Sequence, residues 1–256
     1  MNILCIGNSF SIDAARYLHQ IAKAAGKDIN VGNLYIGGCP ISRHLQNINN
    51  PDIHDYEFHF NGKRIDDNWY NIFFGLHYMK WDYITFQQVS GLSVDSKTYF
   101  PELSELLEKV RKESDATFIL HRTWAYAPTH SHEKYGSNPL DQKAMHEDIV
   151  KAYEEVSKIT GIPYIIPSGS GIYDGCTKLH RIMHRDGFHI NERGRTLCGI
   201  IWAYYFFGLD IDVSSYEPEG YSYDDVTPPV SKKEYKELIE LAREVIKNNK
   251  KYNLIK

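Results

Sequence analysis

Short apolar runs alternate with longer amphipathic segments along this chain, and this alternation limits the possible folds more than any other feature. Five runs have the length of buried strands, at residues 2–6, 29–36, 81–86, 117–121 and 162–166. Apolar residues recur at helical spacing over 13–25, 102–111, 140–160, 191–207 and 232–248. Strands that alternate with helices fold as a parallel sheet with helices on both faces. We therefore predict a three-layer α/β/α structure with a five-stranded parallel sheet.

Two segments depart from this alternation. Residues 56–60 and 63–67 flank Asn61-Gly62, a strong hairpin signal, so we expect a small β-hairpin inserted at the edge of the sheet. Residues 213–230 are rich in Ser, Tyr, Asp and Pro and are predicted to form a surface loop before a last, charged, exposed helix. No repeat or low-complexity linker divides the chain. We expect a single domain over 1–256, with a core at about 2–210 and a C-terminal loop and helix at about 211–256.

Composition excludes several broad classes of protein. The formal net charge of −4 over 256 residues argues against nucleic-acid binding, which favours a basic excess. No apolar run approaches the roughly 18 residues that a membrane span needs. The four cysteines form no C-x-x-C pair and are expected to be free thiols. Nothing in the sequence points to a particular oligomeric state.

The N-terminus bears on the compartment. Met1 leads directly into the apolar run Ile3-Leu4-Cys5-Ile6, which is typical of a core strand rather than of a signal peptide. As numbered, the chain is expected to be cytoplasmic. A signal peptide removed before residue 1 would make it secreted or periplasmic.

Small and polar residues follow the first three predicted strands, at the sheet edge where ligands of open α/β sheets bind. Ser9, after the first strand, lies at the start of a helix, where free N–H groups favour developing negative charge; Ser9, Ser11 or Asp13 could equally be only a helix cap. Gly37-Gly38 lets a backbone N–H approach a ligand, or forms a plain turn. Gln87-Gln88 offers amide donors, or simply faces water.

Two later segments add further candidates. Trp124 and Tyr126 follow the fourth strand and could form a substrate wall or a hydrophobic cover over the sheet. Asp186 and His189 are spaced so that the carboxylate can orient the imidazole, the side chain best suited to accept a proton near neutral pH. Together, these segments gather a nucleophile, a base, an orienting acid and oxyanion donors at one edge of the sheet. We therefore predict an acyl-transfer site.

The same segments resemble the sequence blocks of the SGNH, or GDSL-like, serine hydrolases. These blocks are a nucleophile block, a glycine block, an amide block and a D-x-x-H block, and here they look like Gly7-Asn8-Ser9-Phe10-Ser11, Gly37-Gly38-Cys39, Gln87-Gln88 and Asp186-Gly187-Phe188-His189. The combination of I-G-N-S-F-S, W-D-Y-I-T-F-Q and R-D-G-F-H-I-N is similar to the DUF4886 branch. The resemblance covers roughly residues 2–210.

This resemblance implies a flavodoxin-like fold and an esterase that needs no cofactor and often removes acetyl groups from carbohydrates. It implies Ser9 as nucleophile, His189 as base and Asp186 as the third member of a triad. The oxyanion hole would combine the backbone N–H groups of Ser9 and Gly38 with a side-chain amide. The usual G-x-N-D block is absent, so we expect Gln87 to supply that amide, with Gln88 as the alternative.

Three other interpretations stay open at this point. A metal-dependent hydrolase could use the His180/His184 or His130/His132 pairs, although no H-E-x-x-H motif is present. A non-catalytic carbohydrate-binding protein could keep the fold. An acyltransferase would use the same triad and the same acyl-enzyme, and would differ only in the group that attacks it.

Overall fold

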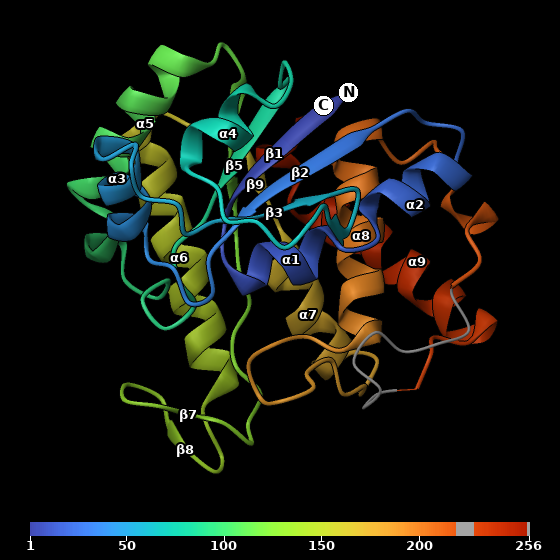
Figure 1. Cartoon of the computed structure of the whole chain (residues 1–256). Coiled ribbons are helices and arrows are strands. Elements are labelled where there is room, and N and C mark those ends of the chain that lie inside the picture. The colour runs from blue at the N-terminus through green and yellow to red at the C-terminus, as the bar shows by residue number, and fades with distance from the viewer. Residues whose placement is uncertain (219–227, 255–256) are drawn as a thin grey trace.

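The computed structural model describes residues 1–218 and 228–254. Its central sheet contains the five predicted parallel strands, in the order β2-β1-β5-β6-β9 (Figure 1). Their bounds are Asn2–Gly7 for β1, Asn30–Tyr35 for β2, Tyr83–Phe86 for β5, Thr117–His121 for β6 and Ile165–Ile166 for β9. This order is that of flavodoxin-like folds, and the strand order reverses beside β1. The predicted three-layer α/β architecture is confirmed.

The central strand β1 is buried on both faces. Ile3, Leu4, Cys5 and Ile6 are almost fully buried, and the strand pairs in parallel with β2 on one side and β5 on the other. A continuous apolar run without alternation is what a strand between two helical layers requires. Residues that follow β1 therefore emerge at the centre of the carboxyl edge of the sheet.

The predicted hairpin is present at the edge of the sheet. β3 (Glu57–Phe60) pairs antiparallel with β2, and β4 (Lys63–Arg64) pairs antiparallel with β3. Asn61 and Gly62, which join them, have φ values of +52° and +83°. Two consecutive positive φ values are what a two-residue hairpin turn needs, and Asn and Gly adopt them at the least cost. These two strands extend the sheet to seven.

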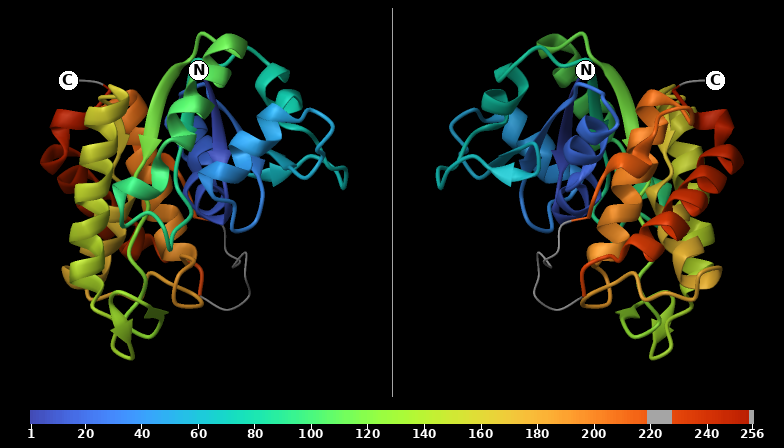
Figure 2. Two further views of the ribbon diagram at one scale, coloured as in Figure 1. Left: turned by 90° about the vertical axis from the view of Figure 1, so that its left-hand side faces the viewer. Right: turned by 90° about the vertical axis from the view of Figure 1, so that its right-hand side faces the viewer.

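Helices cover both faces of the sheet (Figure 1). One layer contains α3 (Ile41–Asn49), α5 (Glu102–Glu113) and α6 (Gln142–Thr160); the other contains α1 (Ser9–Ala15), α2 (Leu18–Ala24) and α8 (Glu192–Phe207). The remaining helices are α4 (Ile72–His77), α7 (Ser168–Thr177), α9 (Lys232–Asn248) and the short 3₁₀ turns Ser96–Tyr99, Val213–Ser215 and Lys250–Tyr252. A second hairpin, β7 (Ser131–His132) with β8 (Gly136–Ser137), projects beyond the carboxyl edge of the sheet (Figure 2).

Several elements differ from the sequence-based prediction. The first helix begins at Ser9 rather than 13 and is divided into α1 and α2 around Arg16 and Tyr17. Helices α3, α4 and α7 and the β7–β8 hairpin were not predicted. These helices have 9, 6 and 10 residues, and α7 contains three glycines, so none shows an extended apolar period.

The last helix, α9, has the predicted bounds but is not simply exposed. One face packs against α8, and it buries Tyr235, Leu238, Ile239, Leu241, Ala242, Val245 and Ile246. Of the predicted loop 213–230, residues 213–215 form a 3₁₀ turn, and 219–227 lie outside the described residues. The four cysteines are free thiols, as predicted. Within the described ranges, no helix combines the length and apolar character needed to cross a membrane.

Glu234 ties α9 to α8 and to its own N-terminus. Its carboxylate lies 2.8 Å from Arg193 Nε and completes a capping box with Ser231. Burial alone would raise the pKa of Glu234, but the hydrogen bonds from Ser231 and Arg193 lower it to about 2. A lowered pKa means that the charged group stabilises the folded state above its ordinary value and that this contribution is lost as pH falls through the folded value.

We predict that Glu234→Gln lowers the melting temperature at pH 7 and that the difference from wild type shrinks as the pH falls from about 5 toward about 2. Thermal unfolding at a series of pH values measures this. Glu217→Gln is the control, because its ion pair with Lys232 is exposed and contributes little to stability. A pH-independent difference for Glu234→Gln would contradict the prediction.

Candidate active site

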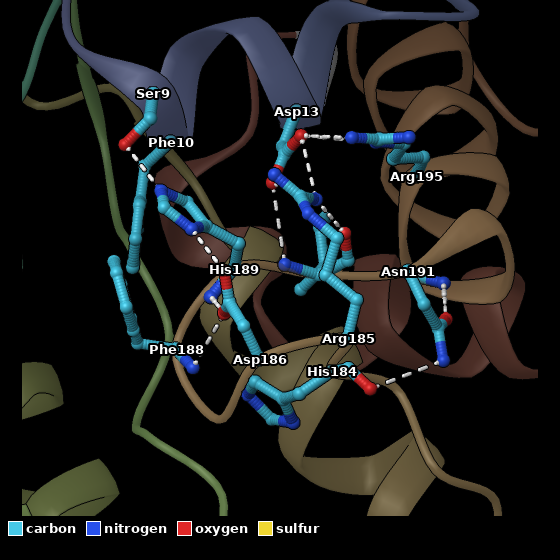
Figure 3. Close-up of polar contacts among 12 residues, drawn as sticks. Ser9, Phe10, Asp13, His184, Arg185, Asp186, Phe188, His189, Asn191 and Arg195 are labelled. Atoms are coloured by element: carbon cyan, nitrogen blue, oxygen red, sulfur yellow. Dashed lines mark hydrogen bonds and ion pairs between the residues drawn. The ribbon is translucent and has the colours of Figure 1, made fainter. Parts of the chain in front are cut away.

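Ser9, His189 and Asp186 form one hydrogen-bonded line at the carboxyl edge of the sheet (Figure 3). Ser9 Oγ lies 2.8 Å from His189 Nε2, and His189 Nδ1 lies 2.6 Å from Asp186 Oδ2. An ionised carboxylate only accepts, so Nδ1 carries the proton and Nε2 is free to accept the serine proton. The structure thus brings together three side chains that are up to 180 residues apart.

The turn after β1 places Ser9 at the first position of α1. Asn8 caps the helix, because its side chain accepts the Phe10 N–H at 3.1 Å. Gly7 is needed for close packing, since a Cβ atom there would lie 2.6 Å from Ser11 Oγ. Asn8 is therefore the N-cap of α1, and the three residues considered as caps from the sequence, Ser9, Ser11 and Asp13, are not. The Ser9 hydroxyl does not cap the helix and instead contacts His189.

Asp186 organises the loop that carries the histidine. One of its oxygens accepts the backbone N–H groups of Phe188 and His189, and the other contacts the imidazole. Burial alone would raise the pKa of Asp186, but these hydrogen bonds, led by that of the His189 ring, lower it below its ordinary value. The carboxylate therefore stays charged near neutral pH, as an orienting group requires.

Gly38 lies beside the serine turn. Its φ of +62° favours glycine, and the backbone is exposed there. Asn8 Nδ2 donates to Cys39 O at 3.0 Å, so the same side chain that caps α1 also fixes the glycine loop. The backbone around Ser9 and the backbone around Gly38 are thereby joined through one buried amide.

The two glutamines are buried and have partners inside the protein. Gln87 Nε2 donates to Asn8 Oδ1 at 2.8 Å, and Gln87 Oε1 accepts from His121 Nδ1. Gln88 Oε1 accepts the N–H groups of Ile41 and Val89, and its Nε2 donates to Thr98 O at 2.7 Å. Neither amide is a polar strand end facing water.

For Trp124 the structure contradicts the substrate-wall interpretation. Its side chain is fully buried and stacks on Phe10, with ring centroids 4.2 Å apart. Its Nε1 donates to Phe188 O at 2.8 Å, so Trp124 joins α1 to the histidine loop, the segment 185–190 that carries His189. Tyr126 is 8% exposed, and its hydroxyl forms a hydrogen bond with Ser90 Oγ. Trp124 therefore packs inside the protein, whereas a substrate contact by Tyr126 stays a prediction.

The histidine pairs considered for a metal are not assembled as ligand sets. His180 and His184 lie beyond the end of α7 rather than on one face of a helix, and buried His184 contacts Ala125 O. His132 Nε2 contacts Gly91 O. In the part of the chain that the structure describes, no group of three or more His, Cys, Asp or Glu side chains is placed to hold a metal ion.

Comparison with known proteins gives the family. The DUF4886 model, a domain of unknown function, matches residues 2–228. A DUF4886 family protein from Bacteroides uniformis has a crystal structure that is 32% identical, with a TM-score of 0.85 over 97% of this chain and 95% of that one. This chain belongs to the DUF4886 family. A search of curated proteins finds no match.

More distant structures share the fold of this DUF4886 protein. A candidate SGNH hydrolase from Slackia heliotrinireducens is 20% identical, with a TM-score of 0.54 over 79% of this chain and 97% of that one. A candidate GDSL-like lipase from Parabacteroides merdae is 15% identical, with a TM-score of 0.50 over 78% and 93%. The DUF4886 chain therefore has the SGNH hydrolase fold.

Sequence reasoning considered Asp13 only as a helix cap and missed the ion pairs of its carboxylate, which lies one turn beyond Ser9 in the DUF4886 chain (Figure 3). It contacts the guanidinium groups of Arg185 and Arg195, each at 2.9 Å, and accepts the Ile190 N–H at 3.2 Å. Asp13 and Arg195 are each 2% exposed. The spacing of four residues from Ser9 was the available signal, but a lone Asp on a helix also suits a cap or a solvated face.

We predict that Asp13→Asn destabilises the protein by about 3 kcal/mol, because it removes the buried charge shared by Arg185 and Arg195 and leaves Arg195 with only its ion pair to Glu192 among those described. It should also slow the labelling of Ser9 by a fluorophosphonate, since the histidine loop is then held less firmly against α1. Denaturant unfolding and labelling kinetics measure the two effects. Glu154→Gln, which loses the ion pair between α6 and Lys251 and involves no residue of this loop, should label at the wild-type rate. Wild-type labelling by folded Asp13→Asn would show that the carboxylate does not position the site.

Proposed function

We propose that this protein is a serine esterase that hydrolyses small acyl esters. The observation that carries the proposal is the line of hydrogen bonds from Ser9 through His189 to Asp186, with the nucleophile at the N-terminus of α1. An activated serine, a histidine with its tautomer set and free N–H groups nearby are the parts of an acyl-transfer site. The SGNH fold supports the same activity.

In the first half-reaction, Ser9 Oγ attacks the ester carbonyl while His189 Nε2 takes its proton. Asp186 holds the Nδ1–H tautomer and stabilises the imidazolium. The tetrahedral intermediate collapses when the C–O bond to the alcohol breaks and His189 returns the proton to the departing oxygen. Water then attacks the acyl-serine with His189 again as base, which releases the acid and restores Ser9.

The backbone N–H groups of Ser9 and Gly38 are the donors proposed to stabilise the oxyanion. The partial positive charge at the N-terminus of α1 adds to their effect. A single oxyanion donor is typically worth roughly 3 kcal/mol of transition-state stabilisation. No cofactor enters this mechanism.

Aromatic side chains near the histidine favour a small acyl group. The rings of Phe188 and Phe10 lie 4.0 and 6.0 Å from the imidazole, measured between centroids, and Trp124 locks Phe10 in place. Figure 3 shows Phe10 and Phe188 on the same side of His189. The acetyl group is the smallest common acyl group, and acetylated carbohydrate is the substrate class that the resemblance implies.

We predict that Ser9→Ala leaves the fold intact and lowers the kcat for p-nitrophenyl acetate by at least about a thousandfold, because the nucleophile and the base act as a unit. Ser157→Ala is the control, since Ser157 lies in α6, away from the site, and its hydroxyl donates a hydrogen bond to Ile162 O. A fluorophosphonate should label wild type and not Ser9→Ala. Full activity of folded Ser9→Ala would refute the mechanism, and loss of wild-type activity in a chelator would favour a metal-dependent hydrolase.

We expect kcat/KM to fall as the acyl chain lengthens from acetate to butyrate to octanoate, because Phe10 and Phe188 limit the space beside His189. Acetylated sugars tested beside the p-nitrophenyl esters should release acetate in the presence of wild type only. Transfer of the acetyl group to an added alcohol, in preference to water, would identify an acyltransferase. A preference for octanoate would contradict the small acyl site.

A further inference from the structure

A continuous line of buried hydrogen bonds runs from α8 to the serine turn. Trp202 Nε1 lies 2.9 Å from Ser168 Oγ, which lies 3.1 Å from His121 Nε2. His121 Nδ1 contacts Gln87 Oε1, and Gln87 Nε2 lies 2.8 Å from Asn8 Oδ1. All five side chains are at most 2% exposed. The predicted mechanism uses none of them directly.

The direction of each hydrogen bond is fixed at the Asn8 end. Asn8 Oδ1 accepts the Phe10 N–H, and Asn8 Nδ2 donates to Cys39 O. A backbone N–H can only donate and a carbonyl can only accept, so the Asn8 amide has one possible orientation. Gln87 must then present its NH₂ group to Asn8 Oδ1 and its oxygen to His121.

The same direction is imposed from the other end. The indole N–H of Trp202 can only donate, so Ser168 Oγ accepts it and is free to donate its own proton to His121. Burial lowers the pKa of His121 to about 3, so the ring is neutral and carries one N–H. That proton lies on Nδ1, where Gln87 Oε1 needs a donor. No member of the line can turn without leaving a partner unsatisfied.

The Ser168–His121 pair has the geometry of a second serine–histidine site but cannot serve as one. Both residues are fully buried, and a histidine with a pKa of about 3 is a poor base at neutral pH. The line instead ends at Asn8, the residue that joins the Ser9 turn to the Gly38 loop.

We infer that Gln87 and His121 are positioning residues, which act through Asn8 to fix the spacing between the backbone N–H groups of Ser9 and Gly38. Gln87 thus supports the oxyanion hole without donating to the oxyanion itself. This inference rests on the proposed function, because it concerns the two N–H groups assigned there. It differs from the expectation that the Gln87 amide contacts the substrate.

A double-mutant cycle separates the two roles. Gln87→Met, His121→Phe and the double variant are assayed with p-nitrophenyl acetate, and thermal unfolding confirms that each is folded. If the line positions the oxyanion donors, each single variant should lower kcat by roughly 10-fold to 100-fold with little change in KM, because misplaced donors fail mainly in the transition state. The double variant should be no slower than the slower single variant, since both changes break the same line.

His146→Phe is the matched control. His146 is another histidine whose pKa is lowered by burial, but it stacks on Tyr173 between α6 and α7 and should keep the wild-type kcat. Should His121→Phe fail to fold, Ser168→Ala tests the same line, and it should also lower kcat, by a smaller factor.

Direct donation by Gln87 gives a different result: Gln87→Met alone would be severely slow, and folded His121→Phe or Ser168→Ala would match wild type. That outcome overturns the inference, as would losses that multiply in the double variant. The proposed function is tested separately, because Ser9→Ala decides it. An inactive Ser9→Ala together with a fully active His121→Phe would refute only the positioning role.

Discussion

The Asp13 carboxylate is the contact on which the geometry of the candidate site depends. Ser9 begins α1, whereas His189 belongs to a loop more than 170 residues later, and a 2.8 Å contact between them requires both segments to be held rigidly. Asp13, which lies in α1, holds the two segments together because its carboxylate contacts Arg185, Arg195 and the Ile190 N–H. A buried carboxylate that faces two guanidinium groups is costly to disturb, so the loop has one favoured position.

A second constraint acts on the other side of Ser9. Asn8 accepts from Phe10 and donates to Cys39, and Gln87 and His121 orient it from the ends of β5 and β6. Ionic contacts thus fix the histidine relative to the serine, while neutral hydrogen bonds fix the glycine loop relative to the serine. Both networks act on the turn between β1 and α1, beside which the strand order reverses.

Much of the fold could be predicted because its determinants are local. Buried strands appear as apolar runs, α9 as a charged helical period, and the β3–β4 hairpin as Asn61-Gly62. The short helices α3, α4 and α7 could not be predicted, since they are stabilised mainly by tertiary packing. The buried face of α9 could not be predicted either, because it is covered by α8, a tertiary contact.

The same distinction between local and tertiary determinants applies to the candidate site. Ser9, Asp186 and His189 could be placed together because each follows a strand or precedes a helix, and such positions converge at one edge. The side chains around them could not be assigned, because burial and hydrogen-bond partners decide what Trp124, Gln87 and Asp13 do. Trp124 is a packing residue because Phe10 covers its face, and Gln87 is a link because Asn8 and His121 take both ends of its amide. Residue type and spacing therefore identify the candidate reactive atoms, whereas the groups that hold those atoms in place follow only from the packed structure.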